Sequence, residues 1–293
     1  MGRKKVVIMS CLIFCILILM KDFVNAETKD NSQVPEWLKR TSYGINIDSS
    51  QKPRIYIETV QPLYQDEDKI DTFFTHGRIN IQNERGIYNL GLGYRRLLTE
   101  EFLAGINTFF DYQDLHNHYR TGFGLEAIGK RAEARLNTYF GLSPTRKVKE
   151  TASSTQYEKA VDGFDVELGG PVPYLPWLKL FGSYYQYDFK KFKDMQGSKI
   201  RSEIKLIKCL TINLETYDDN KGEREYAMDT RFNFAFDNFS FKDFLSAFKL
   251  ENEKYKEVNL RDRTLDRVER NFNIQVEKWA EVTGMTVEIG RGS

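Results

Sequence analysis

Hydrophobic and polar residues alternate along much of the chain after residue 40. In the stretch 102–113 one face holds Ala104, Ile106, Thr108, Phe110 and Tyr112, and the other holds Gly105, Asn107, Phe109 and Asp111. The stretches 119–127 and 226–236 alternate in the same way, with charges and glycines on their polar faces. A period of two predicts β-strands that have one apolar face and one wet face.

Clusters of Asp, Asn, Gly and Pro divide this part of the chain into about twelve candidate strands. The strands are expected near 41–48, 53–63, 71–82, 87–97, 102–113, 119–129, 132–141, 160–170, 177–188, 198–207, 209–218 and 225–236. Most are close to the roughly 9–11 residues that a tilted membrane strand requires. An even number of strands also fits a bacterial single-chain barrel.

The links between these strands differ in length. The links near 97–100 and 129–131 are short, whereas 142–159 is long, polar and rich in Ser, Thr and Lys. Short turns on one side and longer loops on the other are typical of outer-membrane barrels. A soluble β-sandwich is the alternative, but it gives no reason for Arg and Glu to recur in mid-strand opposite the apolar face. We therefore predict an antiparallel transmembrane β-barrel over 41–237.

The pattern changes after Phe236. Apolar residues in 240–270, such as Phe241, Phe244 and Phe248, recur at spacings near three to five among many charges. This spacing predicts one or two amphipathic helical pieces, which would cover the pore from the periplasm or bind a membrane surface. The stretch 271–289 returns to extended character, so 238–293 is expected to form a helix followed by an extended linker.

The N-terminus predicts export from the cytoplasm. A positive cluster at Arg3, Lys4 and Lys5 precedes an apolar run over 6–20, and small residues lie near Ala26. This order predicts a signal peptide over 1–26, followed by a short periplasmic segment over 27–40. The alternative is an uncleaved anchor, but the apolar run is shorter than the roughly 20 residues of a membrane helix.

Composition permits several classes and excludes few. The net charge of +1 provides no basic field for nucleic acid. The mean hydropathy of −0.53 resembles that of a soluble protein, but a barrel with a polar lumen has the same property. Cys209 is the one cysteine after the signal region, and His76, His116 and His118 are not spaced for zinc. We expect no catalytic residues, metal, cofactor or small-molecule substrate, since no nucleophile-and-base pattern is present either.

Several ordered motifs resemble the translocator barrel of the intimin and invasin inverse autotransporters. They are NLGLGYRRL at 89–97, GINTFFDY at 105–112, RTGFGLE at 120–126, NTYF at 137–140, GFDV at 163–166, PVPYLP at 171–176 and LDRVERNFNI at 265–274. The resemblance spans 41–277, and the order of the motifs makes it more specific than any one of them.

The resemblance implies a twelve-stranded barrel in the outer membrane of a Gram-negative bacterium, with both chain ends in the periplasm before export. A short helix would follow, and the next residues would run extended through the pore. The resemblance gives candidate pore-lining residues Asn89, Arg95, Asn107, Asp111, Arg120, Glu126, Arg135, Asn137, Asp165 and Glu167. The candidate linker residues in the pore are Arg270, Asn271 and Asn273. The implied partners are outer-membrane lipid, the barrel assembly machinery and periplasmic chaperones.

Family members usually continue into large immunoglobulin-like adhesive domains, whereas few residues follow Glu277 here. We therefore expect a minimal or absent passenger and transfer no host adhesion to this chain. The alternative function is a stand-alone outer-membrane pore, or a structural or surface-binding barrel.

Overall fold

A computed structural model describes the central part of the chain and most of its C-terminal part. The described residues are 35–83, 85–207, 209–234, 251–282 and 285–289. The predicted signal peptide, residues 27–34 of the predicted periplasmic segment and the predicted helix over 240–250 lie outside them.

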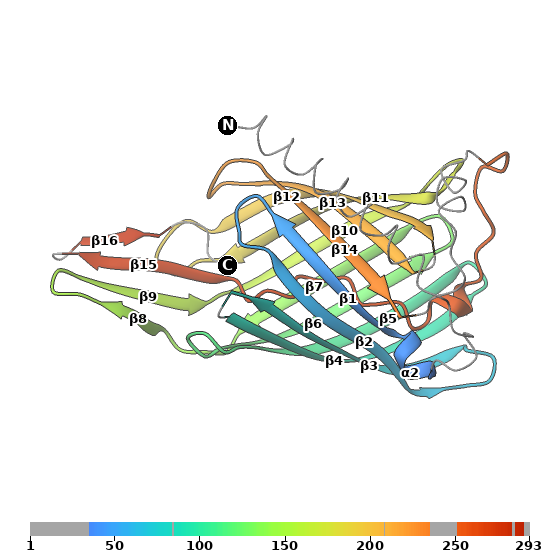
Figure 1. Ribbon diagram of the computed structural model, residues 1–293, viewed down its shortest axis with the longest axis horizontal. Coiled ribbons are helices and arrows are strands. Elements are labelled where there is room, and N and C mark those ends of the chain that lie inside the picture. Colours follow the sequence, from blue (N-terminus) through green and yellow to red (C-terminus); the bar gives the residue numbers. More distant parts are fainter. Residues whose placement is uncertain (1–34, 84, 208, 235–250, 283–284, 290–293) are drawn as a thin grey trace, which may run out of the picture.

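Twelve strands close into an antiparallel barrel (Figure 1). The strands are β1 (Thr41–Asp48), β2 (Arg54–Gln65), β3 (Asp71–Gln82), β4 (Arg85–Thr99), β5 (Phe102–Gln113), β6 (His118–Gly129), β7 (Glu133–Gly141), β10 (Asp162–Val172), β11 (Leu175–Asp188), β12 (Met195–Ile207), β13 (Leu210–Asp219) and β14 (Glu225–Asn233). Each strand pairs with its neighbours in this order, and β14 pairs with β1. Closure leaves no open sheet edge. A sheet can span a bilayer only when it has no open edge, because unpaired backbone groups are costly in lipid. The predicted fold class is confirmed.

The alternation along each strand separates an apolar exterior from a polar lumen. In β4, Leu90 is 63% exposed on the outside, while its neighbour Asn89 is 3% exposed and faces inward. In β5, Ile106 and Phe110 are exposed on the outside, and Asp111 is buried. Bare apolar side chains around a polar interior would be unfavourable in water, but they match a hydrocarbon environment.

A second sheet extends beyond one end of the barrel, on the left in Figure 1. Its strands are β8 (Arg146–Glu150), β9 (Ser154–Ala160), β15 (Val276–Val282) and β16 (Met285–Glu288), in the order β16-β15-β9-β8. The stretch 142–159 is therefore a β-hairpin at this end, where the sequence predicted a long loop. Its strands are polar on both faces, so they lack the alternation that marks a half-buried strand. β9 pairs with β15, which lies far away in sequence.

The other end of the barrel carries the short helix α2 (Glu36–Lys39) and the 3-10 turn η2 (Leu260–Arg263). Within 251–270 this turn is the one helical element of the described residues, and the rest of the expected helical region, 240–250, lies outside them. From Thr264 onward, backbone carbonyls accept hydrogen bonds from barrel side chains, and they do not form the backbone ladder of a helix.

The described part of the chain contains no helix with the length and hydropathy needed to cross a bilayer.

Candidate functional site

The barrel lumen contains a part of its own chain. Residues 264–275, which we call the linker, lead from η2 at one barrel end to β15 beyond the other end (Figure 1). The linker forms no helix or strand, so its backbone groups need partners from elsewhere. Buried backbone groups without a partner are costly, and the inward-facing side chains of the barrel supply many of these partners.

Arg95 of β4 holds the beginning of the linker. The guanidinium is fully buried, and its Nη1 donates to the carbonyls of Thr264 at 3.0 Å and Asp266 at 2.5 Å. Its Nε and Nη2 donate to the two carboxylate oxygens of Glu126 at 2.7 and 3.1 Å. A bidentate pair of this kind fixes the plane of the guanidinium. Glu126 therefore orients Arg95 toward the linker.

Arg120 of β6 makes the matching contacts near the other end. Its Nη2 donates to the carbonyl of Asn271 at 2.6 Å, and its Nη1 donates to the carbonyl of Asn273 at 2.7 Å. Its Nε donates to Asp111 at 2.7 Å. Arg270 of the linker donates to both oxygens of Asp111, at 3.0 and 2.9 Å. Asp111 thus binds one arginine of the barrel and one of the linker.

Two asparagine side chains of the barrel also donate to carbonyls of the linker. Asn89 Nδ2 lies 3.0 Å from the carbonyl oxygen of Phe272. Asn137 Nδ2 lies 3.2 Å from the carbonyl oxygen of Glu269, and it also donates to Asp165 at 2.8 Å. These four barrel side chains, from the three strands β4, β6 and β7, therefore donate to main-chain carbonyls of the linker.

The remaining candidate residues lie on the inward face of the wall. Arg135 donates to Glu167 at 2.9 Å, and Arg201, which the sequence analysis did not select, donates to the same carboxylate at 2.6 Å. Asn107 is 8% exposed, and its side chain packs against Gly124.

Two tyrosines that the sequence analysis did not select also bind the linker. The Tyr139 hydroxyl accepts from the backbone N–H of Asn271 at 2.8 Å and donates to Asp165 at 2.5 Å. The Tyr187 hydroxyl accepts from the side-chain amide of Asn271 at 2.7 Å. Both occupy inward positions of predicted strands. A tyrosine ring suits either lipid or the lumen, so the residue type alone does not mark these two as lumen residues.

Two inward carboxylates that were not among the candidate residues also form ion pairs with arginines. One arginine lies in the linker, and the other lies directly before it. Glu58 of β2 lies 3.3 Å from Arg267, and Glu133 of β7 lies 2.8 Å from Arg263. Strict alternation places Glu58 on the inward face of the predicted strand 53–63, so a residue-by-residue analysis of that strand would have found it.

An apolar cluster anchors the middle of the linker. Val268 and Phe272 are buried against Val60, Phe74 and Phe109 of the barrel wall. The Phe272 ring meets the Phe109 ring edge to face, with centroids 6.1 Å apart. Apolar contact in the lumen removes this linker surface from water and adds to the polar contacts on either side.

Glu277, directly after the start of β15, binds the loop that follows β11. Its carboxylate accepts from three consecutive backbone N–H groups, those of Lys190 at 2.9 Å, Lys191 at 2.8 Å and Phe192 at 3.0 Å. Charge-assisted bonds of this kind are stronger than neutral ones. The loop is thereby joined to the chain that leaves the lumen.

A polar cavity of about 240 Å³ remains beside the linker. Its lining includes Glu167, Lys199, Arg201 and Asp229 of the barrel, together with Glu269 of the linker. The linker therefore fills only part of the lumen, and the cavity lies between the linker and the inward faces of β1–β3 and β10–β14.

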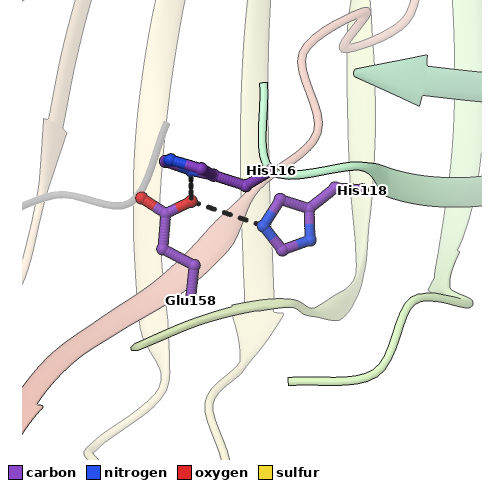
Figure 2. Close-up of side chains that lie close together, drawn as sticks. All are labelled: His116, His118 and Glu158. Atoms are coloured by element: carbon purple, nitrogen blue, oxygen red, sulfur yellow. Dashed lines mark hydrogen bonds and ion pairs between the residues drawn. The ribbon is translucent and has the colours of Figure 1, made fainter. Parts of the chain in front are cut away.

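A cluster of titratable side chains lies at the barrel end that carries the second sheet (Figure 2). His116 Nδ1 lies 2.9 Å and His118 Nε2 lies 3.3 Å from the same carboxylate oxygen of Glu158. His118 Nδ1 also lies 3.0 Å from the Ser143 hydroxyl. Burial would raise the pKa of Glu158, but hydrogen bonds from His118 and His116 and the charge of Lys278 lower this pKa to about 2. The sequence predicted no metal site and no serine-histidine-acid arrangement, since its histidines are not spaced for zinc and no nucleophile-and-base pattern is present; the fold brings Ser143 and Glu158 to His116 and His118 from elsewhere in the chain.

A closed twelve-stranded antiparallel barrel with an apolar exterior and a polar lumen is an outer-membrane β-barrel. The family model described as "Inverse autotransporter, beta-domain" matches residues 19–272. The chain belongs to this family, so the predicted resemblance and the outer-membrane location are confirmed.

Among individual relatives, the "Putative attaching and effacing protein homolog" of Escherichia coli K12 is 28% identical over 55% of this chain and 55% of its own length. The intimin of Escherichia coli O157:H7 is 25% identical over 86% of this chain and 27% of its own length. The chain thus spans about half the length of the first relative and less of the second.

A solved structure titled "Unveiling the Mechanism Behind the in-meso Crystallization of Membrane Proteins" has the same fold. It is 21% identical, with a TM-score of 0.64 over 81% of this chain and 99% of that one.

Proposed function

We propose that the barrel exports the chain segment that follows the linker and then keeps the linker in its lumen as a permanent plug. The contacts between Arg95, Arg120, Asn89 and Asn137 and linker carbonyls carry this proposal. Main-chain carbonyls are present in any sequence, so side chains that bind them suit a lumen through which a polypeptide has passed.

The links between strands differ in length at the two barrel ends, and this difference supports an orientation of the barrel in the outer membrane. The link at 100–101 and the link at 173–174 are short and lie at the end that carries α2 and η2. The hairpin β8–β9 and the loop 189–194 lie at the other end. Outer-membrane barrels have short periplasmic turns and longer outer loops. In this orientation the linker enters from the periplasm, and β15 and β16 are outside the cell.

The role is not enzymatic. The family is of adhesin type, which is consistent with this view. Ser143 is only 4% exposed, so its hydroxyl is poorly placed to attack a substrate, although it contacts His118.

The proposed partners are the lipid around the exposed apolar side chains, periplasmic chaperones and the barrel assembly machinery. A stand-alone pore is the second candidate, and the cavity beside the linker is the observation in its favour.

An epitope tag after Ser293 tests export. Intact cells are probed with antibody, and heat-modifiable gel migration of the outer-membrane fraction shows whether the barrel has folded. A second chain carries the tag within 66–70, a link at the α2 end, as the matched control. We expect the C-terminal tag to be accessible and the control tag to be hidden. A hidden C-terminal tag on a folded barrel would contradict the proposal.

A further inference from the structure

Glu158, His116 and His118 come from two elements that the fold brings together. His116 lies in the turn between β5 and β6, and His118 is the first residue of β6. Glu158 lies in β9 of the second sheet. The nitrogen and oxygen atoms of the three side chains that could bind a metal lie within 4.8 Å of one another. Figure 2 shows both imidazole rings directed at one carboxylate oxygen.

We propose that these three side chains bind a divalent transition-metal ion. Zn²⁺ is the ion that best matches these ligand types. Two imidazole nitrogens and one carboxylate oxygen form a known three-residue zinc set that leaves a fourth position for water. With bonds of about 2.0–2.2 Å, tetrahedral ligand atoms lie roughly 3.3–3.5 Å apart. The 3.3 Å between His118 Nε2 and the Glu158 oxygen fits this spacing, and the 2.9 Å of His116 needs a small outward shift.

Ser143 supplies the outer partner that a ligating histidine usually has. Its hydroxyl lies 3.0 Å from His118 Nδ1. A cation that replaces the hydrogen bond between Nε2 and Glu158 requires the tautomer in which Nδ1–H donates to this hydroxyl and Nε2 carries a lone pair. A cation between the two groups stabilises that arrangement, and the hydrogen bond to Ser143 fixes the tautomer and the ring orientation.

The three side chains differ in exposure, and a lysine lies beside them. The side chain of His118 is 0% exposed and that of Glu158 is 7% exposed, whereas that of His116 is 27% exposed and leaves an open side. Lys278 lies directly opposite Glu158 in the register of β9 and β15, with its Nζ 3.4 Å from the other carboxylate oxygen. Lys278 therefore opposes a bound cation, and its removal is expected to strengthen metal binding.

Metal binding at this position would join three parts of the molecule. The β5–β6 turn belongs to the barrel rim, Glu158 belongs to the second sheet, and β9 pairs with β15, which continues the linker. The ion would therefore fix the sheet at the point where the linker leaves the lumen. This inference does not depend on the export proposal.

The experiment uses the full mature chain, refolded in detergent without a polyhistidine tag. EDTA removes bound metal from the chain, and the EDTA is then removed from the buffer. Zn²⁺ binding is measured by calorimetry, and Co²⁺ serves as the spectroscopic probe because its visible absorption reports tetrahedral coordination. The variants are His116→Gln, Glu158→Gln, Ser143→Ala and Lys278→Gln. Glu281→Gln changes an exposed carboxylate of the same sheet and is the matched control. Heat-modifiable migration shows that each variant has folded.

We expect one Zn²⁺ per chain and a tetrahedral Co²⁺ spectrum. Affinity should fall by more than about tenfold in His116→Gln and Glu158→Gln, and by about tenfold in Ser143→Ala. It should rise in Lys278→Gln and stay unchanged in Glu281→Gln. Equal Zn²⁺ affinity in the wild-type chain and His116→Gln would overturn the proposal, and so would no binding at 100-fold excess metal. Hydrolysis of a short-chain ester by the metal-free chain that Ser143→Ala abolishes would also overturn it, because the cluster would then serve a nucleophilic serine.

Discussion

Arg120 shows how single residues of this barrel act on the linker. It is fully buried, it pairs with Asp111, and it donates to two linker carbonyls. If it is replaced, Asp111 keeps only part of its compensating charge, and the carbonyls lose their donor. Such a residue stabilises the structure through the groups that its removal would leave unpaired.

Arg120→Met is therefore expected to lower the free energy of unfolding by about 3–5 kcal/mol, the usual loss when one partner of a buried ion pair is removed. Urea unfolding of the barrel in lipid vesicles, followed by tryptophan fluorescence, measures this change. Arg224→Met is the control, because Arg224 is 64% exposed and meets Asp218 at 3.3 Å. That change should cost less than about 1 kcal/mol. Equal effects of the two substitutions would show that the buried contacts of Arg120 contribute little.

Glycines on the inward face provide space for lumen side chains. The Gly91 and Gly93 pair could be interpreted from sequence alone as residues that permit close packing in a strand, because no helix follows to form a phosphate-binding loop. In the structure a Cβ on Gly93 would lie 2.2 Å from the ring of Phe74, a side chain that is 1% exposed. Phe74 belongs to the cluster that holds Phe272.

Gly93→Ala should destabilise the barrel by about 1–3 kcal/mol, because the buried ring must shift. The matched change is Gly182→Ala in β11, where a Cβ would meet no atom within 4 Å. It should be neutral or stabilise the fold by up to about 1 kcal/mol, since alanine restricts the unfolded chain. Thermal unfolding of both variants in the same detergent distinguishes these outcomes. A stable Gly93→Ala variant would mean that the Phe74 cluster is loosely packed.

At the scale of elements, the strands that contact lipid could be predicted because each carries an apolar face and a polar face. The alternation in 102–113 corresponds to β5, with Ile106 and Phe110 outside and Asp111 inside. The hairpin β8–β9 could not be found in this way, since its partner β15 lies more than a hundred residues later in the chain. Tyr139 and Tyr187 were missed for a related reason: a tyrosine can face either lipid or the lumen.

Glu277 joins β15 to the loop 189–194, and its replacement tests this contact between elements. Glu277→Gln keeps the shape of the side chain but puts an amide NH₂ group, which is a donor, next to three backbone donors. We expect local destabilisation of about 1–3 kcal/mol. Hydrogen exchange should accelerate in 189–194 and in β15, while β4 and β5 stay protected.

The control for this change is Glu281→Gln in the same strand. The Glu281 side chain is 46% exposed and lies 3.8 Å from Lys191. Its replacement should leave exchange in 189–194 unchanged. If both variants exchange alike, the loop is held by contacts other than the Glu277 carboxylate.

At the scale of the whole molecule, the barrel and its linker form one packing unit. A barrel of eight strands is filled by its own side chains, and barrels of 16–18 strands leave an aqueous channel. Twelve strands lie between these sizes, so space remains that the linker fills in part. The same contacts that bind the linker backbone therefore also close the lumen.

A chain that ends at Asn259 tests this closure. It keeps all twelve barrel strands and lacks the linker, so the space that the linker occupies in the lumen should fill with water. We expect a larger single-channel conductance in planar bilayers than for the full chain, whose remaining cavity is only about 240 Å³. Heat-modifiable migration of the shortened chain is the control for folding. A folded shortened barrel that conducts no more than the full chain would show that inward side chains close the lumen without the linker, and a full chain that already conducts freely would favour the stand-alone pore.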